Sequence, residues 1–281
     1  MAALGTAKKI RITNSLMFQR VMADREICRE VLRAILPKID VGEIVYLDTE
    51  KSLQDSLVAK GIRLDVYARG GDKVYNIEMQ QLNTGSLPER SRYYQAQMDR
   101  DCLERGEDYD ALRECYVIFI CTFDPFGKGE CVYHFEYLCL EAPELELGDG
   151  GHRIFINTQG VRGEITQDLK ALLAYFENRP TEKRTVLVDK IDAAVEAVNR
   201  DTEWRDRMFT LEMQLKEYEK FFSEQGFQKG RREGIDTGEN KSKHEIAERM
   251  LKKGMPFEEI AELTGLMTSE IEALSGKAAE K

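Results

Sequence analysis

The chain has 281 residues, of which 42% are hydrophobic and 33% are charged, and its formal net charge is −10 with an isoelectric point near 5.1. This length and hydrophobic content predict a chain with a proper core, built as one large domain or as one domain with an appendage. The acidic balance argues against a protein that coats nucleic acid by bulk electrostatic attraction. Any contact with nucleic acid must come from local basic patches or from bound cations.

The cysteines and the amino terminus bear on the cellular compartment. None of the six cysteines forms a CxxC pair and most lie in apolar runs, which indicates buried and reduced thiols. The first residues lack the long apolar core of a signal peptide, and no apolar run reaches the length of about 18 residues that indicates a membrane span. These features predict a cytoplasmic protein with no membrane partner.

The first third of the chain predicts one helix followed by three strands. Residues 15–36 carry apolar side chains at spacings of three and four, with Asn14 or Ser15 as the N-cap and Pro37 marking the end. Residues 43–51 predict a short strand. Residues 61–80 contain two apolar runs around the turn-forming sequence GGDK, which is typical of a β-hairpin.

A second helix is predicted at residues 86–106, directly after the hairpin. Ser86 is the expected N-cap, Pro88 lies near the first turn, and Gly106 is the expected stop.

Three further strands are predicted in the middle of the chain. Residues 115–126 form a near-continuous apolar run that is typical of a central, buried strand. Residues 128–139 predict a strand that pairs with it across the turn DPFGKG, and residues 151–160 predict one more. The order of elements predicts an α/β fold with a mixed sheet flanked by helices and a C-terminal helical extension.

The last third is helical and divides into three parts. We expect a core at 1–165, a helical arm at 166–225 that completes or extends it, a connector at 226–240 and a small helical tail at 241–281. The connector repeats glycine every four residues, which suits either close helix packing or a flexible linker, because each glycine costs a helix about 1 kcal/mol relative to alanine. These glycines are Gly226, Gly230, Gly234 and Gly238.

The tail has the rhythm of a helix-turn-helix, with Thr268 or Ser269 as a polar N-cap for its last helix. A small helical cap or an oligomerisation element is the alternative. Its second and third helices weaken the case for direct DNA contact because they carry five glutamates and almost no basic residues: Glu258, Glu259, Glu262, Glu270 and Glu272.

The hairpin carries acids where a sheet usually carries apolar residues. Because side chains alternate along a strand, we expect Ile62, Leu64 and Val66 on one face, and Arg63, Asp65 and Tyr67 on the other. In the second strand, Tyr75, Ile77 and Met79 share one face, while Val74, Asn76, Glu78 and Gln80 share the other. Adjacent antiparallel strands bring Asp65 and Glu78 close together.

Two neighbouring carboxylates repel each other unless a cation lies between them. A hard divalent cation with oxygen ligands, Mg²⁺ or Mn²⁺, suits Asp65 and Glu78, and Gln80 is expected to face the same site. Such an ion acidifies a bound water and offsets charge on a phosphate. The alternative is a solvated sheet face with ordinary surface acids.

The sequence RLDVYA with Asp65, followed by IEMQ with Glu78 and Gln80, resembles the active-site signature of the PD-(D/E)XK nuclease superfamily. More closely, the chain resembles the Rpn-type recombination-promoting nucleases and transposases of that superfamily. The resemblance is clearest over residues 10–160. It rests on three stretches: NSLMFQRVMAD, YLDTEKSLQDSLVAKGIRLDVYA, and the segment from ERSRYYQAQMDRDC to FDPFGKG.

The resemblance implies a restriction-endonuclease-like fold and a metal-dependent DNA endonuclease linked to recombination or mobile DNA. Asp65 and Glu78 take the places of the metal-binding acids, with a backbone carbonyl near Met79. Gln80 stands where many superfamily members have lysine, a familiar variant within this family, and keeps only the hydrogen-bonding part of the lysine's role.

The family often has an aspartate where this chain has Ser15, at the start of the first helix. Glu26 or Glu30 is the expected substitute for that acid.

The helix after the hairpin contains Arg90 and Tyr94, four residues apart and therefore on one helix face. This spacing matches the R-x3-Y pattern of the family. The two side chains either contact a phosphate or a carboxylate at the site, or they form a surface ion pair and a core contact.

These features predict metal-assisted hydrolysis of a DNA phosphodiester, in which Gln80 orients the attacking water and Arg90 neutralises phosphate oxygens. Two alternatives remain: a DNA-binding or interaction protein of nuclease fold that has lost cleavage, and an oligomeric scaffold built on the long helices.

Overall fold

The computed structural model describes residues 9–53, 61–181, 183–210, 213, 238 and 240–279. The chain divides into two compact units, Met1–Asp206 and Arg207–Lys281, and each is described by itself.

A mixed six-stranded sheet forms the centre of the first unit, with strand order β1-β2-β3-β4-β6-β5. The strand β2 runs antiparallel to both β1 and β3, the strands β3, β4 and β6 are parallel, and β5 runs antiparallel to β6 at the edge. The strands are β1 (Ile44–Leu53), β2 (Ile62–Gly70), β3 (Lys73–Gln80), β4 (Glu114–Cys121), β5 (Val132–Phe135) and β6 (Gly151–Asn157).

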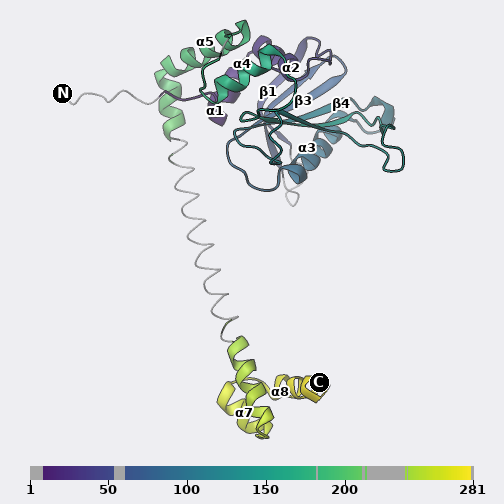
Figure 1. The fold of residues 1–281 in the computed structure, drawn as a ribbon, viewed down its shortest axis with the longest axis vertical. Helices are drawn as coiled ribbons and strands as arrows, with labels where there is room; N and C mark the ends of the chain where they lie inside the picture. Colours follow the sequence, from purple (N-terminus) through teal and green to yellow (C-terminus); the bar gives the residue numbers. More distant parts are fainter. Residues whose placement is uncertain are drawn as a thin grey trace, which may run out of the picture. The chain divides into compact units, whose positions relative to one another are not determined.

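Helices cover both faces of this sheet (Figure 1). Four of them lie on one side, which we call the four-helix face: α1 (Ser15–Met22), α2 (Arg25–Ile35), α4 (Gln167–Phe176) and α5 (Val186–Arg200). The opposite side, the α3 face, is covered by α3 (Leu87–Cys102). A short 3-10 helix (Tyr109–Ala111) precedes β4, and residues 202–210 are helical. The expected α/β fold with a mixed sheet between helices is confirmed.

Alternation along β3 divides its side chains between the two faces, as the sequence predicts. Tyr75, Ile77 and Met79 join the core under the four-helix face, and Val74 joins the core under α3. The strand β4 is buried along nearly its whole length, as expected for the central strand of a parallel segment.

Two glycines are required by the local backbone. Gly71 adopts φ +60° in the turn between β2 and β3, a region that side chains with a Cβ rarely occupy. At Gly151, an added Cβ would lie 2.3 Å from Nε2 of Gln95, so a glycine here lets α3 pack closely on β6.

The predicted helix over 15–36 is wrong in one respect, because it is interrupted. Helix α1 ends at Met22, and Asp24 begins α2 by accepting hydrogen bonds from the backbone N–H of Glu26 and of Ile27, at 2.8 and 3.1 Å. Aspartate is a strong N-cap residue, and its local hydrogen bonds outweigh the continuous apolar period. Of the two expected caps for α1, Asn14 is the one whose side chain accepts the backbone N–H groups of the first turn.

The predicted pairing of residues 128–139 with the central strand is also wrong. The strand β5 pairs with β6, and β4 pairs in parallel with β6 over its length from Cys115–Gly151 to Cys121–Asn157. The carboxylate of Asp124 accepts hydrogen bonds from the backbone N–H groups that follow it and from the Tyr133 hydroxyl. These bonds stabilise a broad loop in place of the tight hairpin turn that direct pairing with β4 requires.

The predicted arm contributes α4 and α5 to the core of the first unit. Leu172 and Phe176 of α4 and Ile191 of α5 are buried in the same core as α1 and α2. All six cysteines are free, and four of them are buried, in agreement with the predicted reduced thiols. Among the described residues, no helix combines the length and apolarity needed to cross a membrane.

The second unit contains the three expected tail helices: residues 240–252, α7 (Phe257–Thr264) and α8 (Thr268–Ala279). Ala247, Ile260, Leu266 and Ile271 form its small core. The polar start of α8 is held by Glu270, whose carboxylate accepts the backbone N–H of Met267 at 2.8 Å. Most of the glycine-repeat connector lies outside the described residues.

Candidate active site

The two hairpin acids lie where β2 and β3 stop pairing. The backbone ladder between these strands runs from Gly70–Lys73 to Val66–Ile77 and does not include Asp65 and Glu78. The pairing of β1 with β2 also omits the position of Glu50 and Asp65, and Glu50 has φ +75°, which is uncommon for a residue with a side chain. The strands β2 and β3 therefore diverge at Asp65, whereas the pairing of β1 with β2 resumes at Lys51–Leu64.

Side chains replace the missing ladder bonds at this point. The backbone N–H of Asp65 donates to Oε1 of Glu78 at 3.0 Å, and the backbone N–H of Met79 donates to Oδ2 of Asp65 at 3.1 Å. Each carboxylate thus satisfies a backbone donor at the point where the strands separate. The structure brings the two predicted acids together.

The divergence corrects the expected alternation along β2. Leu64 is buried under α3, whereas Val66 is buried under the four-helix face, so these two residues do not share a face. Tyr67 is buried under α3 together with Leu64, although the alternation predicts the two residues on opposite faces. The alternation fails because Asp65 lies at an irregular point of the strand, where the backbone turns between its two neighbours.

Gln80, Arg90 and Tyr94 meet beside the carboxylates. Arg90 of α3 donates from NH1 to Oε1 of Gln80 at 2.8 Å and from NH2 to the Tyr94 hydroxyl at 3.1 Å. The same guanidinium lies 3.6 Å from Oε2 of Glu78. The Gln80 side chain is fixed at its other end, because its Nε2 donates to the carbonyl of Leu82 at 2.6 Å. The sequence left open whether Arg90 and Tyr94 lie at the site or form a surface ion pair and a core contact. In the structure both lie beside the carboxylates.

A residue that was not predicted, Gln19 of α1, completes the surroundings of Asp65. Its Nε2 donates to Oδ1 of Asp65 at 2.8 Å, and the side chain is buried. The signal in the sequence is the polar pair Gln19 and Arg20 inside the otherwise apolar run LMFQRVM. The expected substitute acids are not at the site: Glu26 and Glu30 both accept ion pairs from Lys190 of α5, at 2.7 and 2.8 Å.

Asn76 lies two residues before Glu78 on β3 and is fully buried. Among the described residues, neither the amide nitrogen nor the amide oxygen has a hydrogen-bond partner of normal geometry. The amide is still close enough to Glu78 to favour the charged form of that carboxylate. A buried, unpaired amide costs free energy, so its place beside the acids indicates a polar site that is incomplete in the protein alone.

Burial opposes the charged forms of both acids. Together with the neighbouring Asp65 carboxylate, it raises the pKa of Glu78 to about 8, against the opposing effect of Arg90. Burial also raises the pKa of Asp65, although the hydrogen bonds from Met79 and Gln19 favour its charged form. The two acids interact, so the loss of the first proton makes the loss of the second less favourable. The arginine charge nearby does not balance two buried carboxylates.

This donor set fits a hard divalent cation. Two carboxylates supply oxygen ligands, and they lie close together, because Glu78 accepts the backbone N–H of Asp65 and Asp65 accepts the backbone N–H of Met79. Their raised pKa values indicate that positive charge is lacking between them. A cation at this place removes the repulsion and stabilises both charged forms. Asp65 and Glu78 are therefore the residues able to hold Mg²⁺ or Mn²⁺.

Comparison with known proteins gives one match. Residues 15–218 match the family model described as PD-(D/E)XK nuclease family transposase, a span that includes the sheet and all five candidate residues. Neither the curated proteins nor the solved structures gave a significant match.

Proposed function

We propose that this chain, which belongs to the PD-(D/E)XK nuclease family transposases, is a divalent-metal-dependent endodeoxyribonuclease that hydrolyses DNA phosphodiester bonds. The observation that supports this most is the pair of carboxylates at the point where β2 and β3 diverge: Glu78 accepts the backbone N–H of Asp65, and Asp65 accepts that of Met79, the residue after Glu78. The family implies DNA as the substrate. We place its action in the cytoplasm and connect it with recombination or mobile DNA.

Asp65 and Glu78 hold the ion in this proposal, and PD-(D/E)XK nucleases generally use divalent metals. When bound, Mg²⁺ or Mn²⁺ lowers the pKa of a water molecule and offsets the charge that builds on the phosphate. Gln19 and the backbone N–H of Met79 keep the Asp65 carboxylate charged and oriented for this task.

Arg90 supplies the positive charge that Gln80 lacks. A lysine in place of Gln80 would bring its own cation to the site, whereas the amide is neutral and instead accepts a hydrogen bond from Arg90. The guanidinium is packed over the Tyr94 and Phe119 rings, with centroid distances of 5.4 and 5.2 Å. This packing holds Arg90 in one position, from which its free donors are available to non-bridging phosphate oxygens.

Gln80 keeps a hydrogen-bonding role. Its Oε1 accepts from Arg90 and one proton of its Nε2 is used by Leu82, so the second Nε2 proton remains to orient a water molecule. Arg63, an exposed cation whose field favours the charged form of Asp65, is a second candidate for contact with the DNA backbone.

A plasmid-nicking assay tests the proposal. Supercoiled plasmid is incubated with the full chain and Mg²⁺ or Mn²⁺, and the wild type is compared with Asp65→Asn and Glu78→Gln. We expect each variant to lose at least about 1,000-fold in cleavage rate, because each removes a charged ligand of the ion. Asp72→Asn is the matched control, since Asp72 lies in the turn of the same hairpin and its side chain is 80% exposed. It should cut at the wild-type rate.

Two outcomes reject the nuclease proposal. If the wild type cuts with neither ion, yet binds DNA in a gel-shift assay, the chain is a binding protein of nuclease fold. If Asp65→Asn and Glu78→Gln cut as fast as the wild type, the active site lies elsewhere. A size measurement on the same samples tests the scaffold alternative, which predicts a stable homo-oligomer without cleavage.

A further inference from the structure

A second cluster of ligand side chains lies at the other edge of the sheet. His134 is in β5, Glu136 follows directly after β5, and His152 is in β6. Nε2 of His134 and Nδ1 of His152 are 3.3 Å apart, and these two atoms lie 2.9 and 2.8 Å from the same oxygen, Oε1 of Glu136. Three potential ligand atoms therefore form a small triangle.

Protons alone do not satisfy all three sides of this triangle. If both ring nitrogens carry a proton toward Glu136, two N–H groups face each other across the 3.3 Å side. If only one of them carries a proton, the lone pair of the other nitrogen faces a carboxylate oxygen at less than 3 Å. A cation resolves this conflict, because all three atoms then present lone pairs to one point.

The separations are of the size that a metal site requires. Ligand atoms about 2.0–2.1 Å from a tetrahedral zinc ion lie about 3.3 Å from one another. The two histidine nitrogens have this separation, and their distances to Oε1 of Glu136, 2.9 and 2.8 Å, are shorter. We propose that His134, Glu136 and His152 bind a transition-metal ion of the Zn²⁺ class, with the fourth position open to water. Imidazole nitrogens favour such ions, whereas Mg²⁺ prefers a set of oxygens.

The register of the strands explains how the three side chains converge. In the pairing of β5 with β6, His134 lies opposite Ile154 and Phe135 opposite Arg153, so the next pair along is Glu136 and His152. His134 and Glu136 point to the same face because they are two residues apart. The His152 ring is stacked on Tyr116 with a centroid distance of 4.4 Å, which fixes its orientation.

This cluster is separate from the candidate active site. His152 pairs with Tyr116, and Tyr116 pairs with Tyr75, so the cluster is two strands away from β3 and level with a residue three positions before Glu78. Tyr116 and Ile154 are buried under the four-helix face, while Glu78 shares the face of Val74 under α3. The cluster therefore does not supply the ion of the proposed nuclease.

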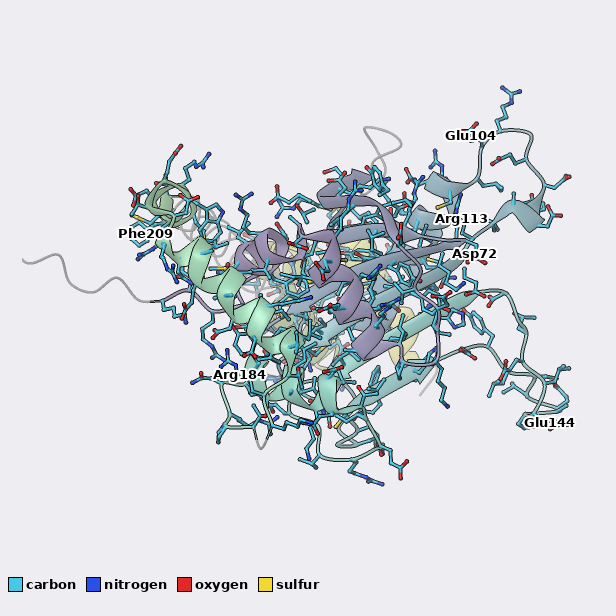
Figure 2. All side chains as sticks on the ribbon, turned by 90° about the horizontal axis from the view of Figure 1, so that it is seen from above. Asp72, Glu104, Arg113, Glu144, Arg184 and Phe209 are labelled. Atoms are coloured by element: carbon cyan, nitrogen blue, oxygen red, sulfur yellow. The ribbon has the colours of Figure 1, made fainter. Side chains whose placement is uncertain are left out.

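The ligands stand at the base of a projecting loop. Glu136 precedes and His152 follows residues 137–151, and Figure 2 shows Glu144 of this loop extending away from the sheet. Within the loop, the backbone N–H of Leu147 donates to the carbonyl of Tyr137, and that of Cys139 donates to Leu145. An ion shared by the two ends would clamp the loop to β6, and binding of that ion would stabilise the folded protein.

The experiment is a titration of the metal-free full chain with Zn²⁺. Isothermal titration calorimetry measures the binding, and the melting temperature is measured with and without the ion. We expect one equivalent to bind and the melting temperature to rise. His134→Ala and His152→Ala should weaken binding by at least about 100-fold and remove the rise. The chain has three histidines in all, so His244→Ala in the tail is the matched control and should bind as the wild type does.

Further variants keep the test decisive. Glu136→Gln preserves the size of the side chain, so it decides the matter if a histidine variant fails to fold. Asp65→Asn with Glu78→Gln removes the other candidate site, and the zinc equivalent should persist in this double variant. Co²⁺ should give the visible bands of a nitrogen and oxygen site without the strong near-ultraviolet absorption of thiolate ligands, which separates the cluster from the six cysteines.

The proposal is wrong if the wild type binds no Zn²⁺ or Co²⁺, since the three side chains then form a hydrogen-bonded group only. It is also wrong if His134→Ala, His152→Ala and Glu136→Gln all bind zinc as the wild type does. Neither result depends on nuclease activity.

Discussion

The two ligand clusters of the sheet use the same architecture and differ in burial. In both, neighbouring strands bring side chains together where their pairing ends: Asp65 and Glu78 from β2 and β3, and the histidine and glutamate group at the end of the β5–β6 pairing. The Glu78 side chain is only 5% exposed, whereas the Glu136 side chain is 32% exposed. Water therefore screens one cluster and not the other.

This difference sets what each cluster costs the folded protein. The buried acids are forced toward their protonated forms, and the fold tolerates them only with a fixed guanidinium and several donors around them. The exposed group at the edge needs no such support. We infer that the carboxylate pair lowers the free energy of unfolding and provides a preorganised site in return. The edge cluster changes the free energy of unfolding little unless it binds an ion.

After the loss of the carboxylates themselves, the largest effect is expected at Arg90, the arginine beside the buried cluster. Arg90→Ala should lower the turnover rate about 100- to 1,000-fold, because it removes a fixed positive charge from the place where phosphate charge develops. Arg90→Lys should recover part of that loss, since a lysine restores the charge and not the two-pronged geometry. Steady-state nicking rates measure both.

Arg33→Ala, an exposed arginine of α2 on the four-helix face, is the control for this series. If Arg90→Ala cuts as fast as Arg33→Ala, the guanidinium only holds Gln80 and Glu78 in place and takes no part in the reaction.

Gln19→Leu should weaken binding of Mn²⁺ at the carboxylate pair about 10- to 100-fold, because partners that orient a metal ligand have effects of this size. The variant removes the donor to Oδ1 of Asp65 and leaves its backbone bond to Met79. Calorimetric titration of the metal-free protein is the measurement. Gln167→Leu, on the exposed side of α4, is the control, and equal affinity in the two variants would show that Gln19 is only a packing residue.

Sequence patterns predicted the strands because their physical basis is local. The turn at Gly71 and the apolar alternation gave the hairpin, and the β-branched run gave the central strand β4. The sequence also predicted that Asp65 and Glu78 lie close together, because they are on adjacent antiparallel strands. It predicted that Arg90 and Tyr94 share a helix face, because they are four residues apart. Their grouping around Gln80 follows from these local rules and from the resemblance to the nuclease family.

The parts that were not predicted depend on contacts distant in sequence. Alternation does not reveal that β2 leaves β3 at Asp65, because a single irregular residue changes the face of its neighbours. The bond from Gln19 to Asp65 joins residues 46 positions apart. The edge cluster depends on the pairing of β5 with β6. The sequence pattern predicted a pairing of residues 128–139 with the central strand instead, so it did not bring His134, Glu136 and His152 together.

Glu78→Gln is expected to stabilise the metal-free protein at high pH. The folded pKa of Glu78, about 8, is above its ordinary value of 4.5, so its contribution to stability is fully present below pH 4.5 and is lost as the pH rises toward 8. Glutamine does not titrate and still accepts the backbone N–H of Asp65. The variant should therefore be more stable by roughly 1–3 kcal/mol at pH 8 and about equal to the wild type near pH 4.5.

Urea unfolding in a chelating buffer across this pH range measures the difference. The exposed residue Glu43, replaced in Glu43→Gln, provides the control with the same change in charge. A wild type that is as stable as Glu78→Gln at pH 8 would mean that Arg90 and Asn76 compensate the buried charge in full.

The smallest effect is expected at the edge cluster without metal. His134→Ala should change the free energy of unfolding by only about 0.5–1 kcal/mol in a chelating buffer, because the side chain is 42% exposed on an edge strand and its partners stay hydrated. The same unfolding experiment, repeated with saturating Zn²⁺, should then separate the wild type from the variant widely. A loss above about 2 kcal/mol without metal would show instead that His134 is a packing element of the edge, and the two clusters would then differ in their ligands but not in their contribution to the fold.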